Sequence, residues 1–162
     1  MDARMRVSLF AGVMLACTVA AQSAHAADIY NGLTLAQLKT IFVSAGKTIS
    51  ESGSDYIRLS DGPLVQLADC PDDKNGVCYE VEFSRTFNNE KPTFEAVNKW
   101  NLTTKIPEAS VNGNGELHFE MWVTAVGVTD QLLLDTATWF DKSWSGDSEL
   151  EFWKPYAVDS GK

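Results

Sequence analysis

Apolar side chains recur at helical spacing in three stretches of the chain, each preceded by a threonine that can cap a helix. The predicted helices cover residues 35–45, 94–101 and 130–144. Thr34 and Gln37 also have the spacing of a capping box, in which two side chains satisfy backbone N–H groups reciprocally. The side chains expected to face the core are Leu35, Leu38, Ile41, Phe42 and Ala45, then Phe94, Val97 and Trp100, then Leu133, Ala137, Phe140 and Trp144.

Between and after the first two helices the apolar period changes to two, which is typical of strands with one wet face. Short strands are predicted around residues 49, 57–59 and 65–67, and stronger ones at residues 78–87 and 116–124. In the last strand one face carries Leu117, Phe119, Met121 and Val123, and the other carries Glu116, His118, Glu120 and Trp122. A turn at residues 112–115 precedes it, because Asn and Gly tolerate positive φ.

These elements predict an α+β fold. We expect an antiparallel sheet of about five strands packed with three helices, in the order α-β-β-β-α-β-β-α. With 162 residues, of which 44% are hydrophobic, the chain can form one domain with a substantial core.

The first residues have the pattern of a secretory signal peptide. Two arginines precede an apolar run at residues 7–17, and Ala24-His25-Ala26 forms an A-x-A cleavage motif. We expect residues 1–26 to be removed, leaving a single domain at 27–162 that is secreted, into the periplasm if the source is bacterial. The alternative is a lipoprotein signal, in which Cys17 is lipidated.

Charge narrows the range of partners. Loss of residues 1–26 removes two basic side chains and one acidic one, which changes the formal charge from −9 to −10. An acidic protein repels nucleic acid and anionic membrane surfaces, so neither is expected as a partner of the mature chain. A basic partner stays open.

Cys70 and Cys78 are the cysteines outside the signal, and an oxidising compartment favours a disulfide between them. Strand parity predicts that both sulfurs project from the outer face of a hairpin. His118 is the one histidine outside the signal. Because most metal and nucleophilic sites need more such residues, we expect no metal, no cofactor and no enzymatic activity.

Three groups of residues are candidate sites. Residues 71–76 with Glu82 resemble a calcium loop but have Pro71 at the first ligand position, so an acidic hairpin loop is preferred. His118 beside Glu120, or the pairs Glu80/Glu82 and Glu116/Glu120, could serve a hydrolase, yet carboxylates on a wet strand are common without one.

Trp122 is more informative, because a large aromatic side chain on a wet face needs a cover or a partner. The cover could be Phe152 and Trp153 in the aromatic, acidic tail at residues 145–162. Otherwise His118, Glu120 and Trp122 form a candidate binding surface, unless the parity of the strand is misread.

The chain carries several motifs in an order that resembles that of the YbjN family, whose members are described as sensory transduction regulators. These motifs are Asn98-Lys99-Trp100-Asn101, the strand Gly115-Glu-Leu-His-Phe-Glu-Met121, and Gly127-Val128-Thr129 before a helix, and the likeness spans about residues 33–144. It implies a fold like that of type III secretion chaperones and supplies no catalytic residues.

The function expected from these features is an exported, non-enzymatic, YbjN-like binding or chaperone-like module that recognises a protein or peptide segment. A homodimer stays open. The main alternative is a periplasmic small-molecule sensor domain in signal transduction, which requires an enclosed apolar pocket. A hydrolase that uses His118 or paired carboxylates is the remote alternative.

Overall fold

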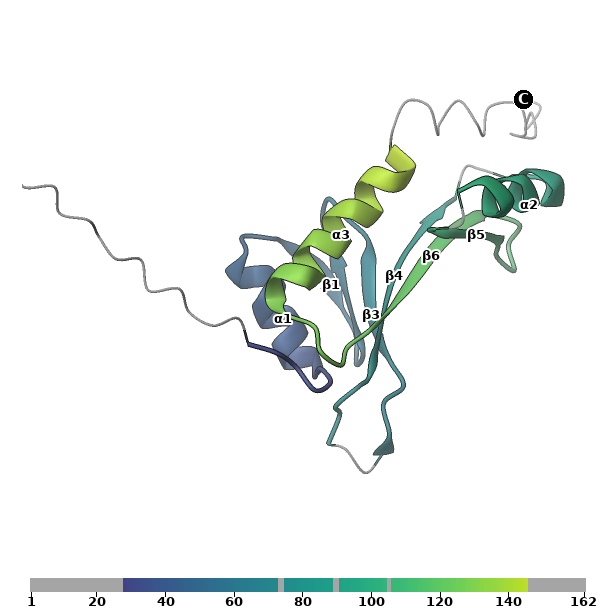
Figure 1. Ribbon diagram of the computed structural model, residues 1–162. Coiled ribbons are helices and arrows are strands. Elements are labelled where there is room, and N and C mark those ends of the chain that lie inside the picture. Colours follow the sequence, from purple (N-terminus) through teal and green to yellow (C-terminus); the bar gives the residue numbers. More distant parts are fainter. Residues whose placement is uncertain (1–27, 73–74, 89–90, 105, 146–162) are drawn as a thin grey trace, which may run out of the picture.

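The computed structural model describes residues 28–72, 75–88, 91–104 and 106–145 (Figure 1). The described chain contains six strands and three helices, which confirms the predicted α+β fold. The sequence predicts about five strands, and the sixth belongs to the group before the second helix. In chain order the elements are α1 (Leu35–Ser44), β1 (Ile49–Ser52), β2 (Tyr56–Leu59), β3 (Leu64–Ala68), β4 (Glu80–Phe87), α2 (Phe94–Thr103), β5 (Glu108–Val111), β6 (Leu117–Thr124) and α3 (Asp130–Ser145).

The strands form one sheet in the spatial order β1-β2-β3-β4-β6-β5, and every neighbouring pair is antiparallel. Strands β4 and β6 pair over eight residues each, from Glu80↔Thr124 to Phe87↔Leu117. They are the longest strands described, and each has a second neighbour over part of its length, β3 beside Glu80–Ser84 and β5 beside Leu117–Glu120. Side chains on these two strands are therefore held on the best-supported part of the sheet.

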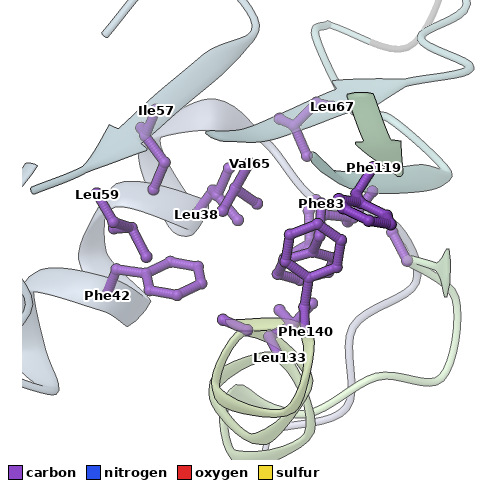
Figure 2. Packing of buried hydrophobic residues seen from close by; sticks show 14 of the residues in the cluster. Leu38, Phe42, Ile57, Leu59, Val65, Leu67, Phe83, Phe119, Leu133 and Phe140 are labelled. Atoms are coloured by element: carbon purple, nitrogen blue, oxygen red, sulfur yellow. The ribbon is translucent and has the colours of Figure 1, made fainter. Parts of the chain in front are cut away.

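All three helices pack on the same face of the sheet. Phe140 of α3 contacts Phe83 of β4, with ring centroids 6.5 Å apart, and Trp100 of α2 contacts Phe119 of β6 at 5.1 Å. Figure 2 shows Phe42 of α1 directed toward side chains of β2 and β3. Cross-strand pairing puts these strand residues on one face, which we call the covered face.

The core lies between the covered face and the helices (Figure 2). The predicted alternation is confirmed there, because Ile57, Leu59, Val65, Leu67, Val81, Phe83, Leu117 and Phe119 are all buried. Met121 and Val123 pack against this core while partly buried. Of the predicted helix stripes, Leu38, Ile41, Phe42, Val97, Trp100, Leu133, Ala137 and Phe140 are buried, and the side chain of Trp144 lies outside the described part.

The predicted helix starts are confirmed. Thr34 and Gln37 form the capping box of α1. Thr93 accepts a hydrogen bond from the backbone N–H of Ala96, and Thr129 accepts one from that of Leu132. These bonds satisfy N–H groups that have no partner within the helix.

Phe94 was expected to pack inward and instead is 77% exposed. The buried stripe of α2 is centred on Ala96, Val97 and Trp100. At about 100° per residue, Phe94 lies roughly a third of a turn away from the centre of that stripe. The prediction was wrong because Phe94 shares a spacing of three with Val97 but not the direction of the whole stripe.

The predicted disulfide is confirmed, with Cys70 and Cys78 bonded across the hairpin between β3 and β4. The expectation that both sulfurs project from the outer face was wrong for Cys78, which is only 3% exposed and belongs to the core. Strand β4 begins at Glu80, and Cys78 instead forms an isolated bridge with Leu33. Parity counted from β4 therefore does not extend back to Cys78.

Helix α2 protects one edge of the sheet. Asn101 donates from Nδ2 to the carbonyl of Ala109 at 2.9 Å and accepts from the Ala109 N–H at 2.8 Å. Ala109 lies on the edge strand β5, so the amide side chain pairs with it as a further strand would. Trp100 Nε1 donates to the carbonyl of Pro107 at 2.8 Å and anchors the same helix to the start of β5.

Candidate functional site

The sheet face opposite the helices is the candidate site, and we call it the open face. Across β4, β6 and β5 its residues are Glu80, Glu82, Ser84 and Thr86, then His118, Glu120, Trp122 and Thr124, then Glu108 and Ser110. No helix of the described chain packs on it. The residues predicted for the wet face of β6, His118, Glu120 and Trp122, all lie here.

Trp122 is 49% exposed and lies on β6 directly opposite Glu82 of β4, just beyond the end of the pairing between β5 and β6. Its parity was therefore predicted correctly. The proposed internal cover, Phe152 and Trp153, lies outside the described residues. Among the described residues the ring keeps about half of its surface open, which is typical of an aromatic side chain available for recognition.

Negative charge is concentrated on the open face. Glu80 and Glu82 lie on β4, Glu120 lies on β6, and Glu108 lies directly opposite Glu120 on β5. The open-face positions of these three strands include no Lys or Arg. Directly opposed like charges destabilise a sheet, so this arrangement costs folding energy that a cationic ligand would recover.

His118 lies between two of these carboxylates. Its Nε2 is 3.6 Å from Oε2 of Glu120 and 4.0 Å from Oε1 of Glu82. Its other ring nitrogen, Nδ1, is 2.9 Å from Oγ1 of Thr86, which is its direct neighbour on β4. The contact with Thr86 fixes the ring so that Nε2 is directed to the carboxylates.

Glu82 is the most enclosed member of this group, since its side chain is only 13% exposed. Burial raises the pKa of Glu82, and the nearby charge of Glu120 raises it further. A hydrogen bond with Ser84 and the proximity of His118 act in the opposite direction. A positive charge placed close to Glu82 would therefore stabilise its ionised carboxylate.

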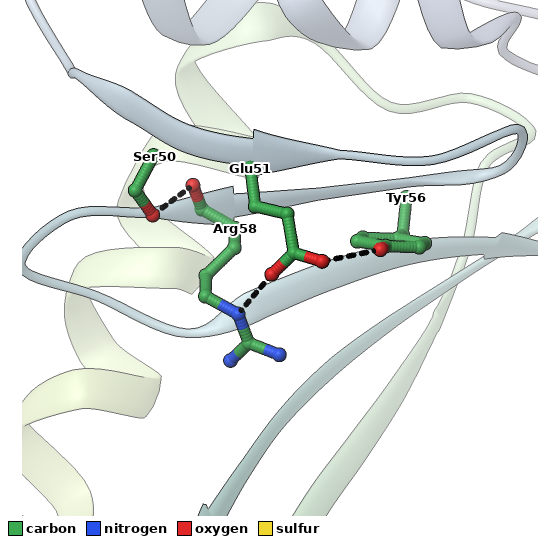
Figure 3. Close-up of polar contacts among 4 residues, drawn as sticks. All are labelled: Ser50, Glu51, Tyr56 and Arg58. Atoms are coloured by element: carbon green, nitrogen blue, oxygen red, sulfur yellow. Dashed lines mark hydrogen bonds and ion pairs between the residues drawn. The ribbon is translucent and has the colours of Figure 1, made fainter.

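A polar cluster continues the open face onto β1 and β2 (Figure 3). Tyr56 donates to Oε1 of Glu51 at 2.7 Å, and Arg58 Nε donates to Oε2 of Glu51 at 3.2 Å. The hydrogen bond from Tyr56, followed by that from Arg58, lowers the pKa of Glu51. This carboxylate is already paired, so the unbalanced charge of the open face lies on β4, β5 and β6.

A nucleophilic site is poorly supported by this geometry. Thr86, His118 and a carboxylate do follow the order of nucleophile, base and orienting group. However, the separations of 3.6 and 4.0 Å from His118 exceed hydrogen-bond length. Around His118, β6 is paired on both sides, so its backbone N–H groups are engaged in the sheet and cannot stabilise an oxyanion.

The sensor alternative needs an enclosed apolar pocket. One cavity of about 310 Å³ lies between the α1–β1 connection, the β2–β3 turn and α3. Its lining combines Lys47, Asp61, Asp141 and Lys142 with Leu59, Pro63 and Ala137, so it is a surface cavity of mixed polarity at the small end of the range for ligand sites.

The calcium-like loop at residues 71–76 can be assessed only in part, because Asp73 and Lys74 lie outside the described residues.

Glu82 and Thr86 are the site residues that sequence reasoning did not connect to His118. The sequence pattern connects Glu82 only with Glu80 and with the calcium-like loop. The missing information was the register between β4 and β6, because a shift of one residue turns Glu82 and Thr86 to the covered face. The alternation of both strands was readable, and their pairing was not.

The fold and site define a class only broadly: a single α+β domain with a helix layer on one sheet face and an acidic, aromatic surface on the other. Comparisons with protein-family models, with curated proteins and with solved structures find no match to this chain. The likeness to the YbjN family thus stays a prediction that depends on the motifs quoted above. Within the described residues, no helix combines the length and apolar character needed to cross a bilayer.

Proposed function

We propose that this protein is an exported, non-catalytic binding module whose open face recognises a basic segment of another polypeptide. The observation that carries the proposal is the position of Trp122, half exposed opposite Glu82 on an acidic face that no described helix covers. Export is supported by the signal-like residues 1–26 and is compatible with the Cys70–Cys78 disulfide.

The chemistry of the face fits a chain that carries lysine or arginine. Glu80 and Glu108 are exposed, and they flank the row that contains Trp122 and Glu120. A cationic side chain can stack on the indole and pair with a neighbouring carboxylate at the same time. Neutralising the carboxylates also relieves the repulsion between Glu108 and Glu120, so a bound cationic segment would also stabilise the sheet.

The test uses labelled peptides of about 12 residues, long enough to cross the sheet when extended. One peptide is rich in Lys and Arg, and its counterpart has Glu at the same positions. Binding to the tag-free mature protein is measured by fluorescence anisotropy in the presence of EDTA. We expect the basic peptide alone to bind, with an affinity that falls as salt is added.

Two tryptophan variants localise the binding. Trp122→Ala should weaken binding of the basic peptide about tenfold, as expected for an aromatic anchor. Trp139→Ala is the matched control, because Trp139 is 48% exposed but lies on α3, on the helix side of the sheet. Equal binding of both peptides, or an equal effect of the two substitutions, would refute the proposal.

A further inference from the structure

A cluster of three potential metal ligands lies on the open face. Nε2 of His118 and one carboxylate oxygen each from Glu82 and Glu120 all lie within 4.8 Å of one another. Glu120 follows His118 by two residues on β6 and so shares its face, while Glu82 reaches the cluster from β4. Two strands paired over their full length thus bring together one imidazole and two carboxylates.

From this arrangement we propose that His118, Glu82 and Glu120 bind a divalent transition-metal ion of the Zn²⁺ type. The proposal differs from the expectation drawn from the sequence, which predicted no metal because only one histidine follows the signal. A single histidine can still be joined by carboxylates to complete a set of ligands. Here one of these carboxylates, that of Glu82, comes from the neighbouring strand.

The distances are close to those of a coordination shell. Zn²⁺ bound at about 2.0–2.1 Å from nitrogen and oxygen in a tetrahedron requires ligand atoms roughly 3.4 Å apart. The two separations from His118 Nε2, 3.6 and 4.0 Å, exceed this by a few tenths of an ångström. Rotation about the glutamate side-chain bonds can close such gaps while the strands stay in place.

The orientation of His118 is a second observation in favour of a metal. The Thr86 hydroxyl oxygen lies 2.9 Å from Nδ1 and can accept a hydrogen bond from the Nδ1–H, which leaves the lone pair of Nε2 directed at the two carboxylates. In that tautomer a cation would satisfy all three groups at once. A partner on the distal ring nitrogen is the usual support of a metal-bound imidazole.

The ligand types select the class of ion. Imidazole favours Zn²⁺ and its transition-metal neighbours over Mg²⁺ and Ca²⁺, which take oxygen ligands almost throughout. Three protein ligands leave a fourth position of a tetrahedral ion open. Because the cluster lies on the open face, with side chains 13–30% exposed, that position is directed away from the core.

The experiment is a calorimetric titration of the tag-free mature protein with Zn²⁺ and, separately, with Mg²⁺, after treatment with a chelator. A polyhistidine tag must be absent, since it binds the same ions. We expect one Zn²⁺ per chain and at least a hundredfold weaker binding of Mg²⁺. His118 is the only histidine after residue 26, so its single set of imidazole NMR signals reports directly on ligation.

Substitutions distinguish direct coordination of Zn²⁺ from a nonspecific effect of the negative charge on this face. His118→Ala, Glu82→Gln and Glu120→Gln should each weaken Zn²⁺ binding more than about tenfold, and Thr86→Val about tenfold. Glu108→Gln is the control, because Glu108 faces Glu120 on β5 but is not one of the three ligands. The glutamine variants preserve side-chain shape, and their circular dichroism spectra show whether they are folded.

Unchanged imidazole signals at saturating Zn²⁺, equal affinity for Mg²⁺, or an equal effect of Glu108→Gln and Glu82→Gln would each overturn the metal site. The titration contains no peptide, and the peptide assay is performed in EDTA. The two proposals therefore succeed or fail separately.

Discussion

Replacing Asn101 by Ala tests how the edge of the sheet is stabilised. The side chain makes two hydrogen bonds to the backbone of Ala109, at 2.8 and 2.9 Å, and Ala109 is only 2% exposed. The substitution removes both bonds and leaves a donor and an acceptor without a partner. At about 1 kcal/mol for each bond, plus part of the penalty for unsatisfied buried groups, the cost should be about 2–3 kcal/mol.

The measurement is urea unfolding of the oxidised mature protein, followed by tryptophan fluorescence. Total stability of a domain is about 5–15 kcal/mol, so a loss of this size shifts the midpoint clearly. Hydrogen exchange adds a local readout, because the amide of Ala109 should exchange faster in Asn101→Ala than in the wild type.

Asn98→Ala is the matched control for this substitution. Asn98 lies one turn earlier on α2 and is exposed, so its replacement changes helix propensity equally and removes no bond to β5. Its effect should stay within about 0.5 kcal/mol. Asn101→Asp keeps the acceptor but directs a carboxylate at the Ala109 carbonyl, and it should destabilise at least as much as Asn101→Ala. If Asn101→Ala and Asn98→Ala unfold at the same urea concentration, the edge-pairing argument is wrong.

Two further predictions concern stability and titration. Reduction of the Cys70–Cys78 disulfide, which closes a loop with a sequence separation of 8, should lower the free energy of unfolding by about 2.5 kcal/mol in urea titrations; a loss below about 0.5 kcal/mol would contradict this. Tyr30 donates to the carboxylate of Asp130 at 2.7 Å, and this hydrogen bond, with burial second, raises the pKa of Tyr30 to about 12. Because the pKa of Tyr30 is higher in the folded state than in the unfolded state, the bond contributes fully to the stability of the fold below about pH 10. This contribution is lost as the pH rises to about 12. Absorbance titration should show a late tyrosine step that Tyr30→Phe removes, and identical titration curves of the two proteins would refute the assignment.

Most of the fold was readable from the sequence because burial imposes a period on each element. The alternation in β4 and β6 identified Val81, Phe83, Leu117 and Phe119 as core residues, and threonine caps located the helix starts. The pattern failed where periodicity was extended past a true boundary, as at Cys78. Periodicity describes a regular element and contains no information about the bend that ends it.

The candidate site was predicted in part. His118, Glu120 and Trp122 were placed on one face correctly, because residues two apart in a strand share a face. Glu82 and Thr86 were not connected to them, since their proximity depends on which strands pair and in which register. That information comes from the packing of the whole sheet, to which residues far apart in sequence contribute.

The placement of all three helices on the covered face explains why the open face can hold unfavourable charge. Burial of Phe83, Phe119 and Phe140 stabilises the sheet from the helix side, so the opposed carboxylates of Glu108 and Glu120 can be tolerated on the other. The two proposed ligands use this charge differently. A bound dication would neutralise Glu82 and Glu120 and leave Glu80 and Glu108 to attract a basic segment, so metal occupancy should weaken the electrostatic part of peptide binding and leave the contact with the indole ring unchanged.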